Sequence, residues 1–130
     1  MTTAVRRAQI LIVEDDAEVL EAMSEALVEE GYAVATAKNG QEALDYLDRA
    51  LAPDLIILDL TMPIMDGREF LERRRRRSDL ATVPVMVVSA TTDARIANQG
   101  VQVLRKPVDL DVLLENIARH VNASEPSQTV

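Results

Sequence analysis

Six polar side chains of this sequence stand within three residues of the ends of short, largely apolar runs. They are Glu14, Asp15, Asp16, Asp59, Ser89 and Lys106. Asp59 follows Leu55–Leu58, a continuous apolar run typical of a strand buried on both faces. A carboxylate beside such a strand is costly to bury unless something pairs with it. Asp59 is therefore either a turn residue in water or part of a site.

If these polar groups meet in space, their chemistry is specific. Clustered carboxylates repel until a cation neutralises them, and oxygen ligands without His or Cys select a hard ion such as Mg²⁺. A carboxylate can attack phosphorus and form an aspartyl phosphate. The transferring group then needs positive charge and donors around its oxygens. Mg²⁺, Lys106 and the Ser89 hydroxyl would supply them, with Asp59 as the nucleophile.

The apolar pattern predicts the elements that position these groups. Expected strands are 10–13, 33–37, 55–58, 85–88 and 101–104, and expected helices follow at about 17–30, 43–51, from 68, 93–99 and 110–121. This alternation predicts an α/β fold with a parallel sheet and helices on both faces. Ligand sites in such sheets lie beyond the carboxyl ends of the strands. The six polar residues should therefore converge on one edge.

Length and composition limit the classes of function. The 130 residues suit one domain at 9–121, between a flexible N-terminus at 1–8 and a disordered tail at 122–130. The chain has no cysteine, no apolar run approaching a membrane span, and a net charge of 14 − 22 = −8. These features favour a cytoplasmic protein and disfavour binding to a membrane or to nucleic acid.

Four segments carry a resemblance to a known family: ILIVEDD, LIILDLTMPIMDG, VMVVSA and RKP. In order and spacing they resemble the receiver domain of bacterial two-component response regulators, over roughly residues 9–121. The resemblance implies a flavodoxin-like five-stranded sheet in the order 2-1-3-4-5. It also implies these roles: Asp59 as phosphoacceptor, Asp15 as a direct Mg²⁺ ligand, Glu14 as a ligand through water, Thr61 as a ligand through its backbone carbonyl, Ser89 as the switch hydroxyl and Lys106 as a contact of the phosphoryl group.

The resemblance further implies partners. A histidine kinase or a phosphotransfer protein would donate the phosphoryl group, and a separate effector would receive the signal through protein contacts. Such a protein is no enzyme beyond phosphorylating and dephosphorylating its own aspartate. Because no second domain follows residue 121, we expect a stand-alone receiver that is a monomer or a weak dimer.

Two departures from the family pattern support an alternative. Val103 stands where the family has an aromatic switch residue, and the segment from Thr91 to Gly100 is short, which predicts a stunted or mobile fourth helix over 93–99. The alternative is a docking module with the receiver fold that works without phosphorylation. A hydrolase is disfavoured because Thr61 replaces a second acid, and a flavodoxin-like cofactor protein because acidic residues follow the first strand.

Other charged residues have simpler interpretations. Asp16 is expected to cap a helix rather than bind a metal, and His120 is expected to be solvated. The run Arg73–Arg77 is interpreted as a solvated face with Glu69–Arg73 and Glu72–Arg76 pairs rather than as a nucleic-acid contact. Arg74 occupies an apolar position of its helix, and we expect it to direct its charge outward to solvent.

Overall fold

The computed structural model describes residues 7–91, 96 and 101–124 of the chain. Its strands are β1 (Gln9–Val13), β2 (Ala33–Ala37), β3 (Leu55–Leu58), β4 (Val85–Ser89) and β5 (Gln102–Arg105). Its helices are α1 (Ala17–Glu29), α2 (Gly40–Arg49), α3 (Gly67–Arg75) and α5 (Leu110–Ser124). The helix expected over 93–99 lies outside the described residues, apart from Ile96. Of the helices that are described, none is long and apolar enough to cross a membrane.

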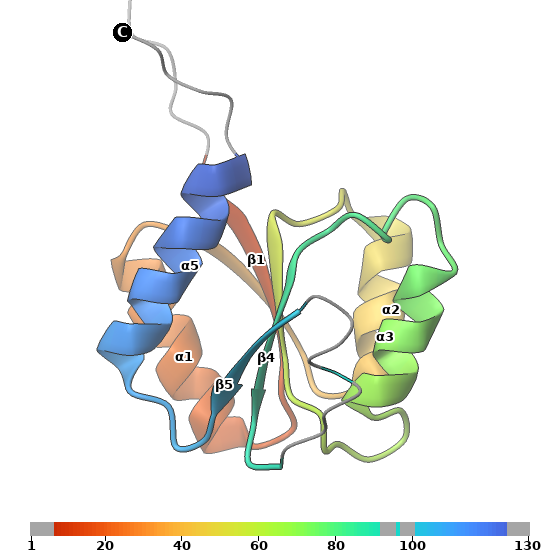
Figure 1. Cartoon of the computed structure of the whole chain (residues 1–130), viewed down its shortest axis with the longest axis horizontal. Helices are drawn as coiled ribbons and strands as arrows, with labels where there is room; N and C mark the ends of the chain where they lie inside the picture. Colours follow the sequence, from red (N-terminus) through yellow and green to blue (C-terminus); the bar gives the residue numbers. More distant parts are fainter. Residues whose placement is uncertain (1–6, 92–95, 97–100, 125–130) are drawn as a thin grey trace, which may run out of the picture.

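The five strands form one parallel sheet in the order β2-β1-β3-β4-β5. Figure 1 shows α1 and α5 on one face of this sheet and α2 and α3 on the other. The predicted α/β architecture and strand order are therefore confirmed. All carboxyl ends of the strands lie at the same edge, as parallel pairing requires.

Alternate residues of the strands pack into two separate apolar clusters, one on each face of the sheet. Leu11 and Val13 of β1 pack toward α2 and α3, whereas Ile10 and Ile12 pack toward α1 and α5. All four residues of β3 are buried, as its unbroken apolar run predicts for a central strand. A rigid, fully buried β3 fixes the position of the residue that follows it, Asp59.

Polar caps fix where the helices beside the site begin. The Asp16 carboxylate accepts from the backbone amides of Glu18 and Val19 and starts α1. Asp66 caps α3 in the same way through the amide of Glu69. The expectation that Asp16 is a helix cap is therefore confirmed.

Two expectations about charged side chains are corrected. Arg74 does not reach out to solvent: its guanidinium donates to the backbone carbonyls of Ala81 at 3.1 Å and Val83 at 2.6 Å. His120 is half-buried rather than solvated, and its Nε2 lies 2.8 Å from Gln102 Oε1. Both side chains bind polar groups on a neighbouring segment of the chain. The spacing of residues within one helix does not predict such contacts.

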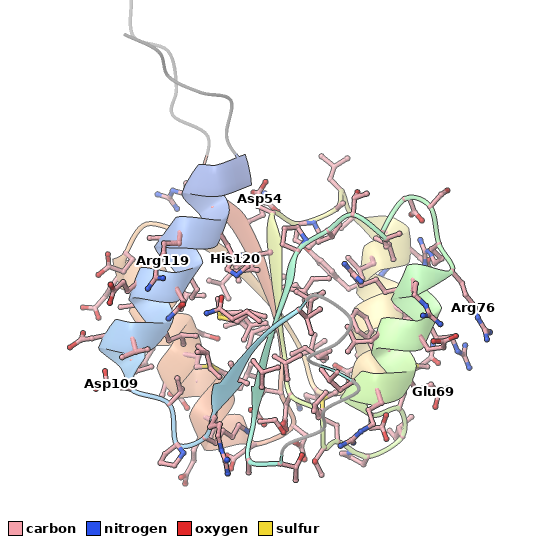
Figure 2. All side chains as sticks on the ribbon, in the orientation of Figure 1. Asp54, Glu69, Arg76, Asp109, Arg119 and His120 are labelled. Carbon is pink, nitrogen blue, oxygen red and sulfur yellow. The ribbon has the colours of Figure 1, made fainter. Side chains whose placement is uncertain are left out.

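Arg73 and Arg76 behave as expected for a solvated face, whereas Arg77 is half-buried and pairs with Asp48 of α2 and with Asp79. Arg73 pairs with Glu69 at 2.9 Å and Arg76 with Glu72 at 3.2 Å, and the four side chains are 41–72% exposed. Figure 2 shows Glu69 and Arg76 on the outer side of the molecule.

Helix α5 continues to Ser124, beyond the boundary expected at residue 121.

Candidate functional site

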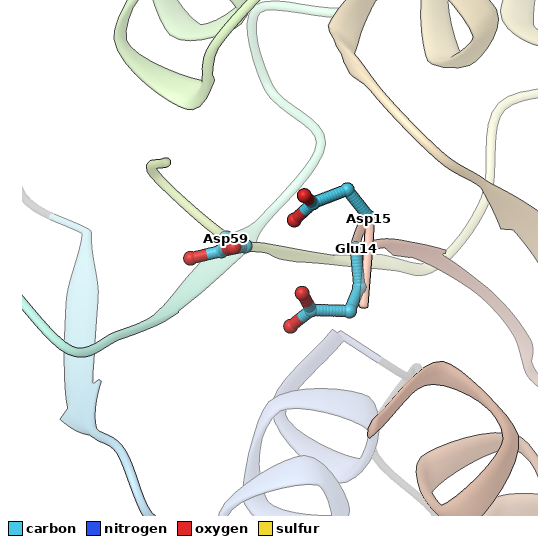
Figure 3. Close-up of side chains that lie close together, drawn as sticks. All are labelled: Glu14, Asp15 and Asp59. Atoms are coloured by element: carbon cyan, nitrogen blue, oxygen red, sulfur yellow. The ribbon is translucent and has the colours of Figure 1, made fainter. Parts of the chain in front are cut away.

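Three carboxylates meet at the carboxyl edge of the sheet. Glu14 and Asp15 follow β1, and Asp59 follows β3, whose Leu58 is in register with Val13 of β1. One oxygen of each carboxylate lies within 4.8 Å of the others. Figure 3 shows the three side chains gathered at this point. Neighbouring parallel strands therefore bring together acids that are far apart in the sequence.

Backbone hydrogen bonds hold two of these acids in buried positions. Glu14 is 1% exposed and Asp59 is 6% exposed, whereas Asp15 is exposed. The Asp59 amide donates to Val13 O at 3.0 Å, and the Asp59 Oδ1 accepts from the Thr61 amide at 3.4 Å. Two buried carboxylates this close require a positive charge nearby.

Lys106 supplies that charge from the end of β5. Its Nζ lies 2.6 Å from Glu14 Oε1 and 3.5 Å from Asp59 Oδ2. The Lys106 amide donates to Ser89 O at 3.0 Å, which extends the pairing of β4 and β5 up to the lysine. The lysine is thus anchored by its backbone while its side chain reaches both carboxylates.

The burial of this cluster shifts its proton affinities. Burial raises the pKa of the Glu14 carboxyl above its usual range, although the hydrogen bonds from Lys106 and from the Asp16 amide act in the opposite direction. Burial alone would lower the pKa of Lys106, but the hydrogen bond to Glu14 and the charge of Asp59 raise it. Lys106 therefore stays protonated and ready to contact an anion.

Ser89 ends β4 at the same edge, but its hydroxyl has other partners. It is fully buried, and its Oγ lies 3.1 Å from Thr91 Oγ1 and accepts from the Thr91 amide at 3.2 Å. Thr91 as the partner of Ser89 was not predicted from the sequence. The Ser89 hydroxyl can keep accepting from the Thr91 amide while its single O–H donates to Thr91 Oγ1 or to another acceptor.

The loop from Asp59 to α3 is closed tightly against the site. Gly67 donates its amide to Leu60 O at 3.0 Å, and a Cβ at Gly67 would lie 2.4 Å from Asp59 O. Only glycine permits this approach. The contact of Gly67 with Asp59 was not predicted from the sequence.

A groove of about 520 Å³ opens beside Lys106, between α1 and the connection from β5 to α5. Its lining is largely apolar and consists of Val19, Ala22, Met23, Ala90, Lys106, Pro107, Val108 and Leu110. Lys106 belongs both to this groove and to the carboxylate cluster. The surface around the site is therefore apolar on the side of α1.

The donor set of the cluster fits a hard divalent cation. Glu14, Asp15 and Asp59 offer only oxygen atoms, and no His or Cys stands among these three ligands. The exposure of Asp15 leaves a path from solvent. The structure thus brings together Glu14, Asp15, Asp59 and Lys106, and it places the backbone of Thr61 against Asp59.

Comparison with known proteins identifies the family. The sequence matches the response regulator receiver domain over residues 10–118. It is 37% identical over 123 residues to the transcriptional regulatory protein GlrR of Escherichia coli, covering 92% of this chain and 28% of that protein. It is 34% identical to the probable transcriptional regulator ycf29 of Porphyra purpurea, covering 83% of this chain and 54% of that protein. The chain thus spans at most about half the length of these relatives.

Solved structures give the same result. The receiver domain of a signal transduction histidine kinase from Syntrophus aciditrophicus superposes with a TM-score of 0.82 at 30% identity, covering 95% of this chain and 96% of that one. The chemotaxis response regulator CheY4 of Vibrio cholerae superposes with a TM-score of 0.80 at 31% identity, covering 88% and 99%. With these matches in sequence and fold, the chain belongs to the response regulator receiver domain family.

Proposed function

We propose that this receiver domain takes a phosphoryl group onto Asp59 from a phosphorylated histidine of a kinase or phosphotransfer protein. The observation that carries the proposal is the position of Lys106 Nζ, 2.6 Å from Glu14 and 3.5 Å from Asp59. A buried carboxylate beside a fixed ammonium group can act as a nucleophile toward phosphorus while the positive charge stabilises the transferring oxygens.

In the proposed step an Asp59 carboxylate oxygen forms a bond to phosphorus as the phosphorus–nitrogen bond of the donor breaks. The imidazole leaves with the bonding electron pair and takes up a proton. Lys106 is close enough to shift from the carboxylates to an oxygen of the new phosphoryl group. The Ser89 hydroxyl would leave Thr91 to donate to another of these oxygens.

Mg²⁺ is the cation that we propose for the carboxylate cluster. Asp15 and Asp59 would bind it directly, Glu14 through water and Thr61 through its backbone carbonyl. When bound, the ion supplies the positive charge that allows an anionic donor to approach three carboxylates. Lys106 alone offsets only part of their negative charge.

The proposed output is a change in protein contacts. Movement of Ser89 toward a phosphoryl group would bias a two-state equilibrium of the surrounding loops, and a downstream effector would bind one state better. We place the protein in the cytoplasm, where kinase domains and effectors meet. The absence of nucleic-acid binding and the monomeric or weakly dimeric state stay predictions.

One observation favours a second function, docking without phosphorylation. Val103 is half-buried and packs against the apolar cluster beneath α2 and α3, in place of the aromatic residue expected from the family. A valine has no large ring to move between buried and exposed positions. In this case the fold would present a fixed surface to its partner.

Phosphotransfer from an autophosphorylated histidine kinase tests the main proposal. The wild-type chain is expected to gain the label in the presence of Mg²⁺, and Asp59→Asn is expected to lose it. Asp54→Asn is the matched control, because Asp54 precedes β3 and binds the Gln9 amide away from the site. Equal labelling of the Asp59→Asn variant would contradict the proposal, and a complete lack of labelling would favour the docking function.

A further inference from the structure

Ile64 stands at the centre of a γ-turn in the loop that follows Asp59. Its φ is 69°, and the Met65 amide donates to Pro63 O at 2.8 Å across it. This positive-φ form of the γ-turn is rare and strained, and a β-branched residue is a clear outlier there. Glycine and asparagine adopt a positive φ with a smaller conformational energy penalty.

The strain at Ile64 is not offset by packing of its side chain in the core. It is 83% exposed, whereas Met62 and Met65 on either side are 7% and 4% exposed. Met65 is pinned against α2, since its carbonyl accepts from the Gly40 amide at 2.9 Å and its side chain occupies the space beside Gly40. The two methionines therefore hold the turn rigid and present Ile64 outward.

This turn belongs to the same edge of the molecule as the phosphoacceptor. The loop begins at Asp59 and closes back on it, because Gly67 lies against Asp59 O and bonds to Leu60. Asp59 itself is only 6% exposed. A macromolecular donor has to cover this edge to bring its phosphorus to the carboxylate, and Ile64 is exposed on the loop that leaves Asp59.

The charges at this edge do not recruit such a donor by themselves. Glu14, Asp15 and Asp59 face one lysine, while a phosphorylated histidine is anionic, so the long-range interaction is unfavourable until a cation is bound. Apolar contact is then the available source of binding free energy. Strained residues persist where the surroundings hold them and cluster at ligand-binding sites.

We infer that Ile64 is an apolar contact for the phosphohistidine-bearing protein that phosphorylates Asp59, and that this partner carries an apolar patch beside its histidine. The inference rests on the proposed function, and it adds a determinant of partner recognition that takes no part in the chemistry. Ile64 should therefore matter for a protein donor and not for a small one.

The test compares Ile64→Asn and Ile64→Gly with wild type and with Leu51→Asn. Leu51 is 86% exposed and lies between α2 and β3, so it is a matched exposed apolar residue away from the site. Each protein receives a phosphoryl group from phosphoramidate and, separately, from an autophosphorylated histidine kinase chosen because it labels the wild type. Thermal unfolding of each variant is measured in parallel.

Both Ile64 variants are expected to accept phosphate from the kinase about tenfold more slowly, the loss expected of an apolar contact at the centre of an interface. They should be labelled by phosphoramidate at the wild-type rate and should unfold at a higher temperature, because the backbone strain is relieved. Leu51→Asn should match the wild type with both donors.

Three results would overturn the inference. Unchanged transfer from the kinase would show that Ile64 does not touch the donor. Equal slowing with both donors would show that it acts on the chemistry of Asp59, and a lowered unfolding temperature would show a structural role. If phosphoramidate fails to label the wild type at all, the proposed function itself fails. If phosphoramidate labels the wild type but no histidine kinase does, a protein donor is contradicted.

Discussion

The ammonium nitrogen of Lys106 lies 2.6 Å from Glu14 Oε1, although the two residues are 92 positions apart in the sequence. The contact bridges β1 and β5, which are separated in the sheet by β3 and β4. It passes beside Asp59, whose Oδ2 is 3.5 Å from the same nitrogen. One lysine therefore pairs with two buried carboxylates and ties together the strands that carry the site.

Replacing Lys106 with methionine should destabilise the metal-free protein. Glu14 would be left buried without its cationic partner, and the free energy of unfolding should fall by about 2 kcal/mol. Mg²⁺ should restore part of the loss by neutralising the same carboxylates. Denaturant titrations with chelator and with Mg²⁺ measure both effects, and the exposed Lys38→Met is the control. A Lys106→Met variant as stable as wild type in chelator would contradict this account of the cluster.

The raised pKa of Glu14 predicts a pH dependence of stability in chelator. A carboxyl whose folded pKa lies above its usual 4.5 binds its proton more tightly in the folded state. Its contribution to the free energy of unfolding therefore falls as the pH rises from about 4.5 through the folded pKa. Relative to Glu14→Gln, which cannot titrate, the wild type should lose stability over this window and then level off. Denaturant titrations across the window measure this difference, and a pH-independent one would contradict the shift.

Arg74→Leu should lower stability, contrary to the expectation from helical spacing. The guanidinium donates to the carbonyls of Ala81 and Val83, and a leucine would leave these acceptors without a partner. The expected cost is about 1–3 kcal/mol in the free energy of unfolding. Arg73→Leu, which loses only an exposed pair with Glu69, should change it little. The account of Arg74 fails if both variants unfold at the same denaturant concentration.

Gly67→Ala should disturb both the fold and the site. A Cβ there would lie 2.4 Å from Asp59 O and 2.8 Å from Leu60 Cα, so the backbone that carries the phosphoacceptor has to move. We expect a loss of about 1–3 kcal/mol in stability and slower phosphorylation by a small donor. Gly31→Ala is the control: its Cβ would have open space, but Gly31 has a positive φ. This variant should therefore lose stability and keep the wild-type rate of phosphorylation. Wild-type labelling of Gly67→Ala would show that the loop yields without moving Asp59.

The meeting of Glu14, Asp59 and Lys106 could be predicted from the sequence because the topology of a parallel sheet decides it. Residues that end such strands share one edge, and the apolar runs located the strand ends to within one residue at Glu14 and Asp59. The sequence pattern also identified the cap at Asp16, because a capping carboxylate bonds to backbone amides only two or three residues further along the chain.

The features that were not predicted depend on contacts between segments. Arg74 binds backbone carbonyls that lie outside its own helix. The contact between the Thr91 and Ser89 hydroxyls depends on the side-chain rotamers of both residues. The positive φ of Ile64 runs against its residue type, so a propensity argument places it in extended backbone instead. The close approach of Gly67 to Asp59 is visible only once the loop is closed.

Intact-mass spectrometry after incubation with phosphoramidate tests the central claim most directly. The wild type should gain the mass of one phosphoryl group with Mg²⁺ and not with chelator. Asp59→Asn should gain none, and Asp54→Asn should behave as wild type. A Mg²⁺-dependent gain lost only in Asp59→Asn is the result predicted here. No gain under conditions that label another receiver domain, or a gain that survives in Asp59→Asn, would contradict it.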